Sequence, residues 1–302
     1  MVLLPVLIFM NFLSQEKFNN FPKYKLLLYT AFIFECTIAI LERILYINVF
    51  KLDLGNNEIL TTSDYNYLEF RSIGLYGHPL QNSLIVFIFI LFILVYESNI
   101  VQKFTLSIIG IISIFCFNSR AAIVISISCF GLYLIYWLAT QRKAGCIKML
   151  AFLCILIACV ALYKLYTSGI IGGRLASFGL YDEGSASVRV NAWSIFNYYD
   201  ISDFLLGINS TELDILKYRV GLHAIENFWL NWVLSYGLLF VIGLVIFYIP
   251  VIKRLFRSEH LLCKIFIIIP FITLASTNPS LAVSIIPMTT FLLLSYIMPK
   301  IK

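Results

Sequence analysis

Long runs of apolar residues alternate with polar connections along this chain of 302 residues. A helix needs about 20 mostly apolar residues to cross the hydrocarbon core of a bilayer. The runs predict transmembrane helices at roughly residues 1–13, 24–42, 80–97, 102–118, 121–140, 147–165, 226–250, 261–277 and 279–298. We therefore expect an all-α, polytopic transmembrane helical bundle of about eight or nine spans, the first one incomplete, built as a single domain over residues 1–302.

Two of the connections are long, loop A at roughly 43–79 and loop B at roughly 166–225. About four predicted spans separate them, so both loops are expected on the same side of the membrane. Loop B contains two helix-start signals, the serines 185 and 187 before Arg189 and the stretch that begins at Ser210. The sequence thus predicts short interfacial helices within loop B.

Composition and charge sharpen this expectation. Hydrophobic residues make up 61% of the chain and charged residues only 13%, which excludes a soluble globular enzyme. More than half of the 22 Lys and Arg residues lie in the short connections, and most of the 16 acidic residues lie in the long loops. Because basic connections stay in the cytoplasm, the long loops are predicted outside. The amino terminus then falls outside as well, which favours a missing upstream helix and leaves an inactive fragment as one alternative.

Several arginines on the predicted outer face could bind an anion: Arg71, Arg120, Arg174 and Arg189. Arg120 marks a tight turn between two apolar runs, and Arg189 falls in the first turn of a predicted helix, where free N–H groups favour phosphate. The alternatives are a snorkelling arginine that ends a span and an interfacial helix without a ligand. Glu35 interrupts an apolar run, so it faces either the bundle interior or a water-filled cavity.

Loop B ends with two candidate bases, His223 and Glu226. They are three residues apart, so on a helix they would share a face, and either could accept a proton from an attacking hydroxyl. The alternatives are a solvated loop histidine and a first-turn acid favoured by the helix dipole. Trp193, Tyr198 and Tyr199 could stack on sugar rings, although interfacial aromatic residues are common without a ligand.

Four short motifs together resemble the O-antigen polymerase and ligase superfamily of polytopic bacterial glycosyltransferases. In chain order they are Arg71-x-x-Gly74 followed by His78-Pro79, Ser119-Arg120-Ala121, Ser185-x-Ser187-x-Arg189-x-x-x-Trp193, and Glu226-Asn227-x-x-Leu230 followed by Tyr236-Gly237-Leu238. The resemblance covers most of the chain between residues 65 and 245, and it rests on the order of the motifs around the large loop. Ligases of the family show His-Asn where this chain has Glu226-Asn227, so the resemblance favours a polymerase.

The resemblance implies a metal-independent enzyme of the bacterial inner membrane that needs no cofactor. It would transfer a glycan from undecaprenyl pyrophosphate to the non-reducing end of another lipid-linked repeat unit. Arg120 and Arg189 would hold the pyrophosphate, supported by Arg174 and Arg71, and Glu226 or His223 would be the base. Partners would be the lipid-linked oligosaccharide, the bilayer and a chain-length regulator, with no nucleic acid. The alternatives are an O-antigen ligase acting on lipid A core and, in another class, a lipid-linked-oligosaccharide flippase.

Overall fold

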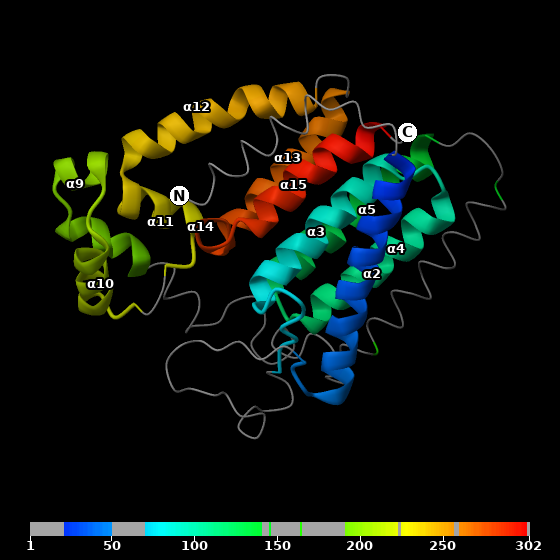
Figure 1. Ribbon diagram of the computed structural model, residues 1–302, viewed down its shortest axis with the longest axis horizontal. Helices are drawn as coiled ribbons and strands as arrows, with labels where there is room; N and C mark the ends of the chain where they lie inside the picture. Colours follow the sequence, from blue (N-terminus) through cyan, green and yellow to red (C-terminus); the bar gives the residue numbers. More distant parts are fainter. Residues whose placement is uncertain are drawn as a thin grey trace. The chain divides into compact units, whose positions relative to one another are not determined.

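The computed structural model describes residues 21–49, 70–140, 191–222, 225–256 and 260–300, with the single positions 145 and 164. These ranges form helices and the segments between them, and no β-strand occurs in them. They fall into two compact units, an N-terminal bundle over residues 21–140 and a C-terminal unit over residues 191–299. The predicted all-α class is therefore confirmed for the described part of the chain (Figure 1).

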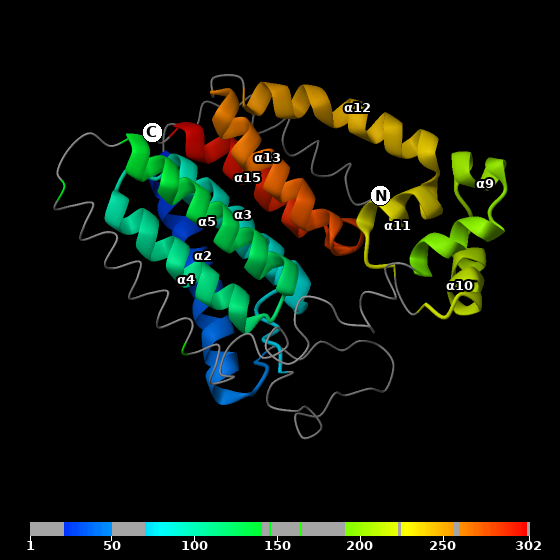
Figure 2. The same cartoon turned by 180° about the vertical axis from the view of Figure 1, so that it is seen from behind.

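The N-terminal bundle consists of four helices that lie side by side in both views (Figures 1 and 2). They are α2 (Phe21–Leu45), α3 (Pro79–Tyr96), α4 (Ile100–Cys116) and α5 (Arg120–Thr140). Pro79 occupies the first turn of α3, where its missing N–H group costs nothing. Asn99 caps α4, because its side chain accepts hydrogen bonds from the N–H groups of Val101 and Gln102. Each of these boundaries lies within three residues of the predicted one.

Helix α2 buries three charged residues inside the bundle and exposes mostly apolar side chains. Glu35, Glu42 and Arg43 are at most 3% exposed, although they lie in one helix of the bundle. Apart from Lys23 near its start, the exposed large side chains of the same helix are apolar: Leu26, Leu27, Ile33, Phe34, Leu41, Ile44 and Leu45. A helix on the surface of a soluble protein shows the opposite arrangement. The outer face of α2 is therefore suited to lipid.

Three of the described helices are long and apolar enough to cross a membrane, namely Lys23–Leu45, Pro79–Tyr96 and Arg120–Thr140. Shorter apolar helices cover Ile100–Cys116, Leu238–Lys253, Leu261–Ser276 and Ile286–Ile297. These helices indicate a membrane protein. The count of eight or nine spans and the side on which each loop lies stay predictions, and the runs at 1–13 and 147–165 lie outside the described residues apart from position 164.

One end of the bundle is fastened by an ion pair between a half-buried lysine and a buried carboxylate. The Lys25 Nζ lies 2.8 Å from Glu97 Oε2, and the Tyr29 hydroxyl donates to the same oxygen at 2.7 Å. Burial alone would raise the pKa of the Glu97 carboxyl, but the hydrogen bonds from Lys25, Tyr29 and the Asn99 backbone outweigh it and lower the pKa. Lys25 and Glu97 therefore tie the start of α2 to the end of α3.

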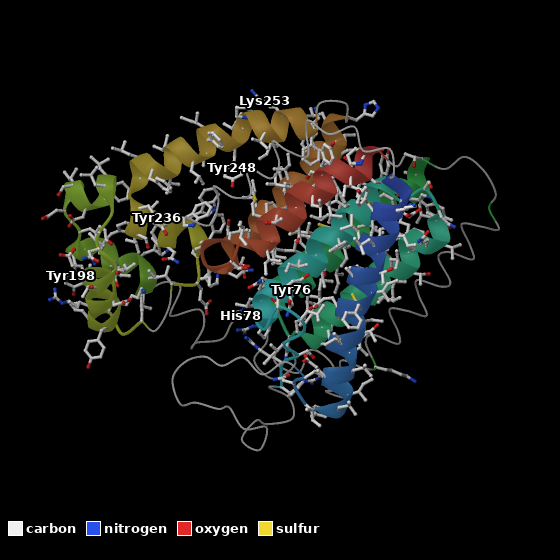
Figure 3. The ribbon with its side chains drawn as sticks, viewed as in Figure 1. Tyr76, His78, Tyr198, Tyr236, Tyr248 and Lys253 are labelled. Carbon is white, nitrogen blue, oxygen red and sulfur yellow. The ribbon has the colours of Figure 1, made fainter. Side chains whose placement is uncertain are left out.

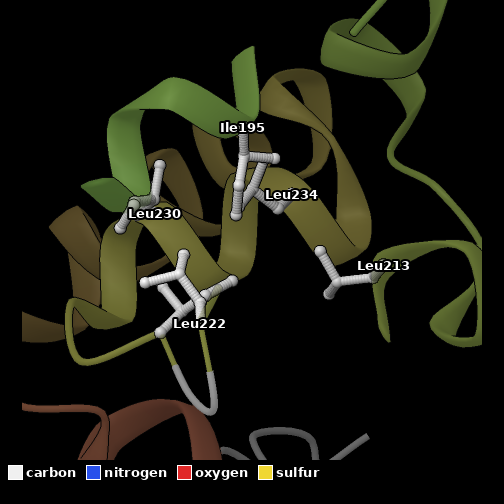
Figure 4. Packing of buried hydrophobic residues seen from close by; sticks show 7 residues of the cluster. Ile195, Leu213, Leu222, Leu230 and Leu234 are labelled. Carbon is white, nitrogen blue, oxygen red and sulfur yellow. The ribbon is translucent and has the colours of Figure 1, made fainter. Parts of the chain in front are cut away.

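The C-terminal unit contains short helices followed by longer ones. They are η1 (Ala192–Tyr198), α9 (Ile201–Leu206), α10 (Ser210–Arg219), α11 (Phe228–Tyr236), α12 (Leu238–Leu255), α13 (Leu261–Ser276), α14 (Ser280–Val283) and α15 (Ile286–Ile297), and the 3₁₀ turn η2 (Met298–Lys300) follows. Apolar side chains from η1, α10, α11 and the segment between α10 and α11 pack into one cluster, which Figure 4 shows: Ala192, Ile195, Leu213, Leu222, Ile225, Leu230 and Leu234. This cluster holds the short helices of loop B against α11. The helix start predicted at Ser210 is confirmed.

Two of the predicted continuous spans are wrong in detail because the helices break. The run predicted at 226–250 is divided at Gly237, which has φ +83° and separates α11 from α12. The run predicted at 279–298 is divided between α14 and α15 at Ser284 and Ile285. Loop A also starts later than predicted, since α2 continues to Leu45.

Candidate functional site

Two of the motifs that the sequence singled out pack against each other at one end of the N-terminal bundle. The backbone N–H of Ser72 donates to the carbonyl of Cys116 at 3.2 Å. The Asn118 side chain donates to the carbonyl of Phe70 at 3.4 Å. These bonds dock the segment that contains Arg71 onto the turn between α4 and α5. Residues 48 positions apart in the sequence are thereby fixed together.

Arg120 follows that turn directly. It is the first residue of α5 and is half-buried, as is Arg71. The preceding Ser119 accepts the first helical hydrogen bond, from the N–H of Ile123 at 2.9 Å. Asn118 makes the turn possible with φ +56°, a conformation that Asn adopts more readily than most residues. Two of the four predicted anion-binding arginines thus lie at the same end of one rigid bundle.

Loop 70–78, which carries Arg71, is held to α2 by buried charged side chains. Glu42 accepts hydrogen bonds from the backbone N–H groups of Ile73 at 2.7 Å and Gly74 at 2.9 Å, and from that of Val49 at 2.9 Å. The Arg43 guanidinium donates to the carbonyl of Phe70 at 2.7 Å. Irregular backbone in an apolar setting must find its hydrogen bonds within the protein. These two side chains supply them.

Loop 70–78 also contacts Ala39 and Glu35, which lie one helical turn apart on α2. The Ser72 hydroxyl donates to the Ala39 carbonyl at 2.7 Å, and the Leu75 N–H donates to Glu35 Oε2 at 3.1 Å. Asn82, in the first turn of α3, donates to the Ile73 carbonyl. Of the two alternatives for Glu35, the described residues favour the one that faces the bundle interior.

Tyr76 and His78 lie at the end of this loop, just before α3 (Figure 3). Tyr76 is half-buried, and both its burial and the neighbouring Glu35 carboxylate raise the pKa of its hydroxyl. His78 is exposed and occupies the cap position of α3 without a capping hydrogen bond from its side chain. The imidazole of His78 is therefore accessible to solvent at the loop end.

Sequence reasoning missed Glu42, Arg43 and Asn82. A usable signal was present, because Glu35 and Glu42 are seven residues apart and so share one face of α2. Two acids on one face of an otherwise apolar helix predict buried polar partners. Which backbone groups they bind could not be predicted, since loop 70–78 is distant in the sequence.

The three predicted sugar-binding aromatic residues lie in the C-terminal unit with different surroundings. Trp193 is 61% exposed, and its ring packs against Phe196 with centroids 5.9 Å apart. Tyr198 is 51% exposed and lies under the Arg219 guanidinium, 5.4 Å from its centroid (Figure 3). The Tyr199 hydroxyl instead donates to a backbone carbonyl of α11 at 3.3 Å. Trp193 and Tyr198 are therefore largely exposed, with the Arg219 guanidinium over one face of Tyr198, whereas Tyr199 anchors η1.

Glu226 lies just before α11, not in its first turn. Asn227 is the cap of that helix, and its side chain accepts hydrogen bonds from the N–H groups of Trp229 at 2.9 Å and Leu230 at 3.3 Å. Glu226 is half-buried in the segment that precedes the cap. The interpretation of Glu226 as a first-turn acid is therefore wrong, because Asn227 caps α11 and the helix begins at Phe228, two residues after Glu226.

Three of the predicted site residues, Arg174, Arg189 and His223, lie outside the described residues. Among the residues that are described, no group of three or more His, Cys, Asp or Glu side chains could hold a metal ion. No protein-family model, curated protein or solved structure matches the chain. Its resemblance to the O-antigen polymerase and ligase superfamily therefore stays a prediction from the sequence motifs.

Proposed function

We propose that this chain is a polysaccharide repeat-unit polymerase of a bacterial inner membrane. It transfers a glycan from undecaprenyl pyrophosphate to the non-reducing end of another lipid-linked repeat unit. The observation that carries the proposal is the packing of the Arg71 segment onto the turn before Arg120, since both segments belong to the motifs that resemble the family. The lipid-suited face of α2 further supports a reaction at the membrane surface.

The chemistry needs few protein groups. An acceptor hydroxyl attacks the anomeric carbon of the donor, the bond from that carbon to the pyrophosphate oxygen breaks, and the pyrophosphate leaves on its lipid. Charge develops on the leaving oxygen, and fixed arginines are suited to stabilise it in a partly dry site. Arg120 and Arg189 take this role, with Arg71 and Arg174 as supporting charges. Glu226 or His223 accepts the hydroxyl proton.

To stabilise the charge on the leaving pyrophosphate, arginines held in fixed positions are more effective than a larger number of mobile ones. A donor group stabilises a developing charge best when no reorganisation is needed during the reaction. Arg120 begins a helix, and Arg71 lies in a loop whose backbone is bonded to α2 and to the end of α4. This anchoring supports a catalytic use of the two arginines over a purely topological one.

Replacement of Arg120 by alanine tests the proposal in cells. We expect long polysaccharide to be lost and single repeat units to remain attached to their acceptor, because the ligation step is still intact. The matched control is Lys253→Ala, which removes an exposed positive charge from α12. Gels of the extracted polysaccharide, compared at equal protein abundance, give the chain length.

Wild-type chain lengths from a well-expressed Arg120→Ala variant would contradict the proposal. Complete loss of attached glycan, including single units, would instead indicate the ligase.

A further inference from the structure

The first turn of α11, which follows the candidate base Glu226, is joined to the end of α13 by a hydrogen bond between two side chains. The Trp229 indole N–H donates to the Ser276 hydroxyl oxygen, and Nε1 lies 2.9 Å from Oγ. Trp229 belongs to the first turn of α11, and Ser276 is the last residue of α13. Residues 47 positions apart in the sequence are thereby fixed together close to Glu226.

The Ser276 hydroxyl is oriented to accept this bond. A serine hydroxyl has one hydrogen, and that of Ser276 is donated to the carbonyl of Ile272, one turn earlier in α13, at 2.7 Å. The lone pairs of its oxygen remain for the Trp229 N–H. An indole N–H can only donate, and it needs an acceptor where the ring is partly buried, as that of Trp229 is. The bond therefore satisfies the Trp229 donor in one fixed direction.

Aromatic packing holds the Trp229 ring in addition to the hydrogen bond. The ring centroid lies 4.4 Å from that of Phe228 in a tilted arrangement and 5.9 Å from that of Trp232 in an edge-to-face arrangement. Phe228 and Trp232 are themselves buried. Replacing Trp229 by phenylalanine would keep an aromatic ring at this position and remove the N–H donor. The effect of the hydrogen bond can therefore be separated from that of the packing.

Glu226 lies between two anchored neighbours. On one side, Ile225 is 3% exposed and packs into the apolar cluster with η1 and α10. On the other side, Asn227 caps α11 and accepts a hydrogen bond from the backbone N–H of Trp229 at 2.9 Å. Because Asn227 is bonded to the first turn of α11, the direction of the backbone at Glu226 depends on where that turn lies. The bond from Trp229 to Ser276 fixes the turn against α13.

We propose that Trp229 and Ser276 are positioning residues for the glycosyl transfer, and that their hydrogen bond holds Glu226 where it accepts the proton of the acceptor hydroxyl. This inference rests on the proposed function and assigns the base to Glu226. The hydroxyl oxygen bonds to the anomeric carbon, the bond from that carbon to the pyrophosphate oxygen breaks, and the hydroxyl proton passes to the Glu226 carboxylate. Proton transfer needs heavy atoms within hydrogen-bond reach, so a small displacement of the base lowers the rate strongly.

Steady-state kinetics of the full chain in proteoliposomes, with labelled lipid-linked repeat units as substrate, test this role. Glu226→Gln should abolish elongation. Trp229→Phe and Ser276→Ala should each lower kcat about tenfold or more and leave KM within about twofold, because substrate still binds but the base is misplaced. Ser276→Thr keeps the hydroxyl and should restore the wild-type kcat. The matched control is Thr273→Ala, which removes an exposed hydroxyl that bonds within α13 to the Ile269 carbonyl.

The double variant Trp229→Phe/Ser276→Ala shows whether the two residues act through one bond. If they do, its kcat equals that of the single variants, whereas independent effects would multiply. Ser276→Ala removes a single oxygen atom and provides the test if Trp229→Phe does not fold.

The inference alone is overturned if the wild type elongates glycans and Ser276→Ala or a folded Trp229→Phe keeps the wild-type kcat. It is likewise overturned if the two effects multiply, if Thr273→Ala loses as much activity, or if Glu226→Gln remains active. A wild-type chain that elongates no repeat unit would overturn the proposed function together with this inference.

Discussion

Gly74 shows how much of the candidate site depends on single residues. Its backbone N–H binds Glu42, its φ of +64° turns the loop toward α3, and its missing side chain leaves room for Glu35 and Asn82. The conformation is one that residues with a side chain rarely adopt. The position of Arg71, three residues earlier, follows from this turn.

We expect Gly74→Ala to lower the free energy of unfolding by about 2–4 kcal/mol, from the strained backbone and the overlap with Glu35. The control is Gly131→Ala in α5, where an added Cβ meets nothing within 4 Å and should be neutral or slightly stabilising. Chemical unfolding in micelles measures both. Equal effects of the two substitutions would contradict the account of loop 70–78.

The buried carboxyl of Glu97 should make the stability of the folded protein depend on pH. Its pKa is lowered in the folded protein, so its contribution is present above the ordinary glutamate value of about 4.3 and is lost as the pH falls through the folded value. Glu97→Gln should cost about 1–3 kcal/mol at pH 7, and the difference should shrink below about pH 4. Unfolding midpoints across this range check it, and a difference that is independent of pH would contradict it.

At the scale of elements, the break between α11 and α12 depends on a contact with α9. Gly207 ends α9 with φ +81°, and a Cβ there would lie 2.6 Å from the Gly237 N atom. The N–H of Ile208 also donates to the Leu234 carbonyl at 3.1 Å. Two glycines with positive φ therefore let the backbones of α9 and α11 approach closely. The short helices of loop B are fixed to α11 by this contact and by their apolar cluster.

Gly237→Ala should be strongly destabilising, by about 2–4 kcal/mol, because the added Cβ overlaps the α9 backbone and the residue has positive φ. Gly243→Ala, five residues inside α12 from the start of that helix, meets nothing within 4 Å and is the matched control. Proteolysis of loop B, followed on gels, reports the loss of the contact. Equal protection in both variants would count against it.

The sequence could predict the helices that depend on local pattern alone. α2, α3, α4, α5 and α13 match their predicted runs because length and apolar composition determine them. The breaks at Gly237 and Ser284 could not be predicted, since the apolar run continues through both and the reason lies in a contact or a turn elsewhere. Likewise Arg71 and Arg120 were identified as candidates, but the hydrogen bonds that hold their segments together join residues far apart in the chain.

At the scale of the whole molecule, the two units divide the proposed roles. The N-terminal bundle holds Arg71 and Arg120 at one end, and the C-terminal unit presents Trp193 and Tyr198 to solvent. A polymerase needs both kinds of group, charges for the leaving pyrophosphate and aromatic faces for the sugars. A flippase would not need arginines fixed at one end of the N-terminal bundle.

Reconstitution tests the proposed polymerase most directly. The purified chain is placed in proteoliposomes with labelled lipid-linked repeat units extracted from the source cells, and the product glycans are separated by length. We predict a ladder of glycans that grows by one repeat unit per step, and its loss in Arg120→Ala but not in Lys253→Ala. Label that crosses the bilayer without growing in length, or a ladder unchanged in Arg120→Ala, would contradict the account.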